Sequence, residues 1–200
     1  MAALQQDGGM NSLIDESESV LCVIDVQAGF LGKLPPKVAD ETVSRIRWLV
    51  QVAVALSIPV VVTEESPDGN GPTVDAVVVR LPGDTKRWPK ESFALVDQPD
   101  ILRDVESTQR RTAVVCGLET DVCVAQSALR LQDVGYRVVA VVDAVASPGS
   151  GQETGLARLR DAGVTLVAAK GLVYEWLRTV QRSDELDAKL SDDIPAGVIL

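Results

Sequence analysis

Short segments that are apolar throughout alternate along this chain with longer segments whose apolar residues recur at helical spacing. The short segments predict strands at 20–26, 58–63, 111–116, 137–142 and 164–168, with a weaker one at 84–88. The longer segments predict helices at 38–56, 98–106, 120–134, 151–162 and 172–181. Strands without a polar face need helices on both sides, so the alternation predicts an α/β fold around a largely parallel sheet.

The composition fits one domain built on an aliphatic core. Apolar residues make up 46% of the 200 residues and aromatic residues only 4%, so aliphatic side chains must fill the interior. We expect a single domain over 19–200 after a flexible segment at 1–18. We also expect a long ordered loop at 66–93, where SPDGNGPT is rich in turn-forming residues. The apolar C-terminal IPAGVIL packs either on a neighbouring subunit or back on its own domain.

Charge and sequence signals limit the partners and the compartment. The net charge of −10 disfavours nucleic acids and anionic membrane surfaces, which both attract basic patches. No apolar run approaches the roughly 20 residues of a membrane span, and the first residues lack the features of a signal or transit peptide. The three cysteines are an odd number, which argues against a disulfide framework. We therefore expect a cytoplasmic protein.

Histidine is absent from the sequence. Its absence excludes Ser-His-Asp and Cys-His mechanisms as well as a zinc site with histidine ligands. We expect neither a metal nor another cofactor. A nucleophilic cysteine in this chain would need activation by other residues.

Cys123 is the candidate nucleophile. A predicted strand, a tight turn at Gly117 and a predicted helix leave Cys123 in the first helical turn, with Thr120 as a plausible N-cap. Unpaired N–H groups and the helix dipole favour an anion there, so we expect the pKa of the thiol to be lowered. The alternative is a small buried residue that packs the start of the helix.

Asp25 and Lys90 are candidate partners of the thiol. Asp25 ends the first strand, and ligands bind at the carboxyl ends of strands in doubly wound sheets. If the strands at 20–26 and 111–116 are neighbours, Asp25 faces the same crevice as Cys123 and can act as its general base. Lys90 could stabilise both anions from between Trp88 and Phe93. The alternatives are a solvated turn for the acid and a solvated surface position for the lysine.

Gln27 and Phe30 follow Asp25 and should lie at the mouth of this crevice. They either orient a substrate or close the turn. Together with Trp88 and Thr120 they form the predicted set of substrate-binding residues.

In this order and at these separations, the residues resemble the isochorismatase-like cysteine hydrolase superfamily. Its members share an Asp near the first strand, a Lys after a long loop, and a Gly-x-x-Thr-x-x-Cys helix start. This chain supplies Asp25 with Gln27 and Phe30, then Lys90 with Ser92 and Phe93, then Gly117, Thr120 and Cys123. The resemblance extends over 20–174.

The resemblance implies a three-layer α/β/α sandwich, Rossmann-like, with a central and mostly parallel six-stranded sheet. It implies Asp25, Lys90 and Cys123 as the catalytic residues. A cis peptide would join Leu118 to Glu119, and the backbone N–H groups of Glu119 and Cys123 would form the oxyanion hole. Family members commonly form dimers or higher oligomers, so a homo-oligomer is expected.

The resemblance also narrows the reaction. Nicotinamidases are excluded because their metal site uses histidines, and the carrier domain often joined to true isochorismatases is absent. The segment 62–74 looks most like the small isochorismatase domain-containing proteins, whose substrate is generally unassigned. We expect a metal-independent hydrolase that cleaves a small amide or related acyl compound through a covalent Cys123 intermediate. The alternatives are an isochorismatase-type vinyl ether hydrolase and a catalytically silent binding or scaffold protein.

Overall fold

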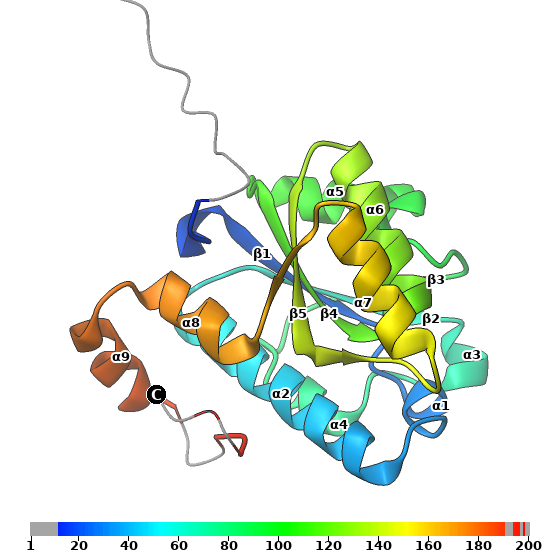
Figure 1. Ribbon diagram of the computed structural model, residues 1–200, viewed down its shortest axis with the longest axis horizontal. Coiled ribbons are helices and arrows are strands. Elements are labelled where there is room, and N and C mark those ends of the chain that lie inside the picture. The colour runs from blue at the N-terminus through cyan, green and yellow to red at the C-terminus, as the bar shows by residue number, and fades with distance from the viewer. Residues whose placement is uncertain (1–11, 191–193, 197, 199–200) are drawn as a thin grey trace, which may run out of the picture.

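A six-stranded parallel sheet forms the centre of the molecule, as a computed structural model shows for residues 12–190, 194–196 and 198 (Figure 1). The strands are β1 (Ser19–Ile24), β2 (Val60–Glu65), β3 (Arg87–Lys90), β4 (Thr112–Leu118), β5 (Arg137–Ala146) and β6 (Thr165–Val167). Their order is β3-β2-β1-β4-β5-β6, and every pairing is parallel. The predicted α/β sandwich is therefore confirmed.

Helices cover both faces of the sheet (Figure 1). One face carries α2 (Pro36–Ala55), α4 (Asp75–Val78), α8 (Ala169–Leu177) and α9 (Val180–Asp187). The other face carries α5 (Pro99–Ser107), α6 (Ala125–Asp133) and α7 (Gly151–Asp161). The shorter elements are α1 (Ala28–Leu31), α3 (Pro67–Asn70), the 3₁₀ turns η1 (Glu16–Glu18) and η2 (Leu95–Asp97), and the π-helical turn η3 (Thr120–Val124).

Strand β1 shows how the sequence produces these layers. All six of its residues are buried. Because side chains alternate along a strand, Leu21 and Val23 pack toward α2 and α8, while Cys22 and Ile24 pack toward α5 and α6. Full burial of such an aliphatic side chain contributes about 1.5–3 kcal/mol, so a strand without a polar face is stable only between two helical layers.

The strand order reverses between β1 and β4, which lie side by side as predicted. Gly117 in β4 has φ +124°, and a Cβ atom at this position would lie 1.9 Å from the carbonyl oxygen of Ile24. Glycine is required here because another side chain would collide with the neighbouring backbone. The close approach brings the end of β1 beside the turn that leaves β4.

The segment predicted as a long loop at 66–93 holds more regular structure than expected. It contains α3, α4 and the edge strand β3, of which Lys90 is the last residue. Pro89 lies in this four-residue strand, and proline is tolerated on a sheet edge. The weaker strand predicted at 84–88 overlaps β3 only at residues 87–88, because the short length and the proline obscure its position in the sequence.

Both ends of the described chain contact the domain. Within the segment predicted to be flexible, Ile14 is fully buried and its N–H donates to Glu175 at 2.6 Å. At the other end, Val198 packs into the core beside α8, and Arg45 donates to the carbonyl of Ala196 at 2.6 Å. The described part of the tail thus folds back on its own chain, while residues 1–11, 191–193, 197 and 199–200 lie outside the described structure.

Within the described ranges, we find no helix with both the length and the apolar character needed to cross a membrane.

Candidate active site

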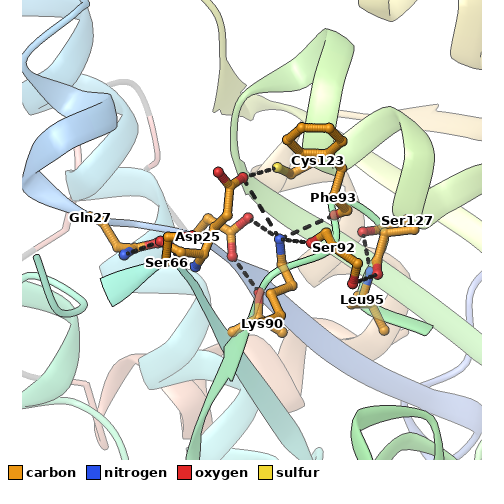
Figure 2. A network of polar contacts seen from close by, with 12 residues as sticks. Asp25, Gln27, Ser66, Lys90, Ser92, Phe93, Leu95, Cys123 and Ser127 are labelled. Carbon is orange, nitrogen blue, oxygen red and sulfur yellow. Dashed lines mark hydrogen bonds and ion pairs between the residues drawn. The ribbon is translucent and has the colours of Figure 1, made fainter. Parts of the chain in front are cut away.

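Three of the predicted site residues, Asp25, Lys90 and Cys123, meet at the carboxyl edge of the sheet (Figure 2). Glu65, which was not predicted, lies against them. Lys90 Nζ lies 2.7 Å from Oδ2 of Asp25 and 4.0 Å from Oε2 of Glu65. The same Glu65 oxygen lies 2.8 Å from Sγ of Cys123. Asp25, Lys90 and Cys123 are therefore close enough to act as one unit.

Asp25 is held rigidly where β1 ends. Its backbone has φ 52°, an uncommon conformation for a residue other than glycine and one found most often at functional sites. Its N–H donates to the carbonyl of Thr63, and its Oδ1 accepts the Thr63 hydroxyl at 2.7 Å. Burial raises the pKa of the Asp25 carboxyl, and the nearby Lys90 ammonium opposes this shift.

Lys90 extends from the end of β3 into the interior and is 1% exposed. Besides Asp25, its ammonium donates to the carbonyls of Ser92 and Phe93 at 2.9 and 3.1 Å. Two carbonyl acceptors and the ion pair with Asp25 thus hold this buried amine in place. The alternative of a solvated surface lysine is wrong, and Lys90 also fixes the loop that follows β3.

Cys123 lies in the π-helical turn η3, which leads into α6, and such turns are frequent at functional sites. Helix α7 and the end of β5 hold this turn in place. Thr120 donates to Gln152 at 2.6 Å, and the Asp121 carboxylate accepts the Ser147 hydroxyl at 2.6 Å. The peptide bond from Leu118 to Glu119 is cis, as the family resemblance implied.

The thiol of Cys123 is not acidic in this setting. Burial is the largest cause that raises its pKa, the charges of Asp25 and Glu65 raise it further, and only Lys90 lowers it. The prediction of a lowered pKa was wrong because the thiol is buried and because Asp25 and Glu65 both lie beside the sulfur.

Glu65 is the residue that the sequence analysis missed. Its backbone is held on both sides, because its N–H donates to Gln27 Oε1 at 2.7 Å and its carbonyl accepts from Gln27 and Asn70 at 3.0 Å. The missed signal was its position as the last residue of β2, a strand that pairs with β1. The rule that led to Asp25 applies equally to this neighbouring strand end.

The four predicted substrate-binding side chains all have partners within the protein. Gln27 uses both ends of its amide on the backbone, with Nε2 also donating to Gly71 at 2.5 Å. Phe30 is nearly buried, against a small cluster that includes Leu118. The remaining two contacts are Trp88 Nε1 to Asp104 at 2.7 Å and Thr120 to Gln152. Their role in substrate binding stays a prediction. Phe93, which was not in the predicted set, is half exposed, and its carbonyl accepts from Lys90.

One group of potential metal ligands exists in this cluster. One atom each from Asp25, Glu65 and Cys123 lies within 4.8 Å of the other two. Lys90 already places a positive charge 2.7 Å from one of the carboxylates. A divalent ion here would have to compete with that ammonium at close range, which is unfavourable.

The sequence of this chain is similar to a known family and to curated proteins. The Isochorismatase domain family model matches residues 19–170. This chain is similar to isochorismatase domain-containing protein 2 of Xenopus laevis, with 32% identity over 179 residues, which is 88% of this chain and 82% of that protein.

Solved structures share the same fold over most of their length. The MAR1 ribonuclease of Caenorhabditis elegans superposes with a TM-score of 0.82 and 26% identity over 94% of this chain and 98% of its own. The YcaC of Pseudomonas aeruginosa, which carries hexane-2,5-diol and covalent acrylamide, gives a TM-score of 0.81 and 25% identity over 88% of each chain. The YcaC of Escherichia coli, an octameric hydrolase of unknown specificity, gives 0.81 and 24% over 88% and 87%.

Proposed function

Because this chain belongs to the isochorismatase domain family, we propose that it is a metal-independent cysteine hydrolase of a small amide or related acyl compound. Asp25, Lys90 and Cys123 are its catalytic residues in this proposal. The observation that carries it is the buried Lys90–Asp25 ion pair of 2.7 Å beside the sulfur of Cys123. Burying a charge pair is costly, so its presence next to a thiol favours a chemical role over a packing role.

The neutral thiol must lose its proton as it attacks. A carboxylate oxygen of Asp25 lies within 4.8 Å of Sγ, a distance that can shorten when a substrate binds, and its raised pKa makes it a stronger base. The S–C bond forms as the carbonyl electrons move to oxygen. When this intermediate collapses, the C–N bond breaks and the departing nitrogen takes the proton from Asp25.

Water then cleaves the thioester. It adds to the acyl carbon with Asp25 as base, the S–C bond breaks, and the sulfur regains a proton. The backbone N–H groups of Glu119 and Cys123 are the proposed donors to the oxyanion in both steps. Lys90 keeps Asp25 in place and offsets the negative charge that moves between carboxylate, sulfur and substrate.

The relatives support a hydrolase of small molecules. E. coli YcaC is described as an octameric hydrolase, and we propose that this chain also forms a homo-oligomer. The covalent acrylamide in the P. aeruginosa protein makes acrylamide a suitable probe of Cys123. A ribonuclease activity like that named for the C. elegans protein is disfavoured, because the net charge of −10 repels RNA.

A screen of small primary amides for ammonia release tests the proposal. Wild type is compared with Cys123→Ala and with Asp68→Asn, which removes an exposed charge from α3. Acrylamide labelling followed by peptide mass spectrometry identifies the reactive thiol without a known substrate. Turnover that survives Cys123→Ala, or labelling of Cys22 or Cys116 before Cys123, would overturn the proposal.

A further inference from the structure

Glu65 contacts the nucleophile and has the most exposed side chain of the four residues in the cluster. The side chains of Asp25 and Lys90 are 0% exposed and Cys123 is 1% exposed, but the side chain of Glu65 is 16% exposed. Its Oε2 lies 2.8 Å from the sulfur. A molecule that reaches the sulfur therefore comes within contact range of the Glu65 carboxylate.

The backbone of Glu65 is held in place, and its carboxylate extends from there to the sulfur. Gln27 bonds to both the N–H and the carbonyl of Glu65, and Asn70 bonds to the same carbonyl. The thiol proton occupies only one of about four acceptor positions of the carboxylate. Glu65 therefore has capacity to accept hydrogen bonds from a bound molecule without leaving its place.

The reaction itself creates a need for such a molecule. When Cys123 gives up its proton, Glu65 loses its hydrogen-bond donor and faces a sulfur anion across 2.8 Å. Lys90 lies 4.0 Å away, is already ion-paired with Asp25 and donates to two backbone carbonyls. An unpaired carboxylate in a partly buried site is unfavourable, so the substrate must supply the missing donor or positive charge.

The charged groups around the sulfur also favour a substrate that carries a positive charge. The cluster places two carboxyl groups and one amine around the sulfur, and attack on a carbonyl adds a negative charge to it. The nearby Lys33–Glu119 pair, at 3.0 Å, is neutral as a unit. An anionic substrate would add repulsion to this cluster, whereas a cationic one would offset it.

We propose that Glu65 selects substrates in which a positively charged nitrogen lies close to the scissile carbonyl, so that the physiological substrate is a small cationic acyl compound. This inference rests on the proposed cysteine hydrolase function and adds a substrate class to it. Dicarboxylate vinyl ethers, the substrates of the alternative reaction, are disfavoured by the same charge.

Two methanethiosulfonate reagents of opposite charge test this selection without a known substrate. In each case the thiolate sulfur attacks the sulfenyl sulfur, a disulfide forms, and methanesulfinate leaves. The trimethylammonium-ethyl reagent is cationic and the sulfonatoethyl reagent is anionic. The rate of each at Cys123 is followed by peptide mass spectrometry and divided by its rate with a free small thiol.

We expect wild type to prefer the cationic reagent, and the preference to weaken as salt is raised. Glu65→Gln should lower the ratio of cationic to anionic rates by about tenfold, a modest figure for the loss of one charge about 4 Å from the reagent. Asp68→Asn removes an exposed charge three residues away and should leave the ratio unchanged. Comparing ratios between variants cancels the difference in reagent size.

The outcomes separate this inference from the proposed function. Equal ratios in wild type and Glu65→Gln would overturn the inference while leaving Cys123 as the nucleophile. The absence of a cationic preference in wild type would overturn it even if Glu65→Gln failed to fold. Modification of Cys22 or Cys116 ahead of Cys123 would instead overturn the proposed function.

Discussion

The ammonium nitrogen of Lys90 lies 2.7 Å from Oδ2 of Asp25, and both side chains are fully shielded from solvent. A buried ion pair contributes little net stability compared with apolar residues, but the loss of one partner leaves the other charge without compensation. The two residues should respond differently to substitution. Without Asp25, the Lys90 side chain still donates to the carbonyls of Ser92 and Phe93, whereas without Lys90 the Asp25 side chain keeps the Thr63 hydroxyl but loses its ion pair.

Lys90→Met keeps the side-chain length and removes the charge. We expect it to lower the free energy of unfolding by about 3–5 kcal/mol, the usual cost of breaking a buried pair. It also removes the donors to the carbonyls of Ser92 and Phe93. Asp25→Asn should cost only about 1–2 kcal/mol, since the amide oxygen can still accept hydrogen bonds from Thr63 or Lys90. Urea unfolding measures both losses.

The exposed Lys37 offers a control for these two variants. It forms only a surface pair with Glu41 at 3.9 Å, so Lys37→Met should change stability by less than about 0.5 kcal/mol. Equal losses for Lys90→Met and Lys37→Met would show that the buried pair is not coupled to the fold.

The reactivity of the Cys123 thiol and the turnover of an amide should change differently in variants of Asp25 and Lys90. The charge of Asp25 raises the pKa of Cys123 and that of Lys90 lowers it. Asp25→Asn should therefore speed iodoacetamide labelling at neutral pH, and Lys90→Met should slow it, because only the thiolate reacts. Both variants should lose amide turnover, since Asp25→Asn removes the proton carrier. Labelling rates that are unchanged in both variants from pH 6 to 9 would show that the three residues are not coupled.

Stability at alkaline pH follows from the same raised pKa. An unfolded cysteine loses its proton near pH 8.5, whereas the folded Cys123 thiol keeps it to higher pH. Its contribution to stability is thus fully present below about pH 8.5 and is lost as pH rises toward the folded pKa, by about 1.4 kcal/mol per pH unit. Unfolding of wild type and Cys123→Ala, compared at pH 8 and pH 10, measures the effect. Wild type should lose more stability than the variant over this interval.

Gly117 and Gly171 should respond in opposite directions to alanine. A Cβ at Gly117 would meet the Ile24 carbonyl at 1.9 Å with φ at +124°, so Gly117→Ala should cost about 3 kcal/mol or more by forcing β1 and β4 apart. Gly171 lies exposed in α8 with open space around its Cα, and alanine should stabilise that helix by about 0.5–1 kcal/mol. Thermal unfolding tests both predictions. If Gly117→Ala is tolerated, the close approach of β1 and β4 does not require glycine at this position.

Sequence patterns were sufficient for the sheet because burial on both faces leaves a continuous apolar run. They also led to Asp25 and Cys123, since strand ends on neighbouring strands converge. Glu65 was missed although it ends β2, because an acidic Glu-Glu pair before SPDGNGPT is typical of a solvated turn. The pKa of the thiol could not be predicted from the sequence, because it depends first on the burial of the sulfur and then on the carboxylates that other strands place beside it.

Removal of the lysine should also change the response of the site to metal ions. In wild type, Lys90 neutralises part of the cluster formed by Asp25, Glu65 and Cys123, so we expect EDTA to leave the thermal midpoint unchanged and elemental analysis to find no stoichiometric metal. In Lys90→Met the same three ligand atoms remain without a cation. Carboxylate oxygens and a thiolate are suitable ligands for Zn²⁺, so added zinc should raise the thermal midpoint of this variant.

The double variant Lys90→Met with Cys123→Ala removes one of the three ligands and should lose that zinc response. A stoichiometric transition metal in purified wild type, or a fall in its midpoint with EDTA, would contradict the prediction. It would show that the ammonium of Lys90 shares the cluster with a metal ion instead of replacing one. A zinc response equal in wild type and Lys90→Met would mean that the ion binds elsewhere on this acidic protein.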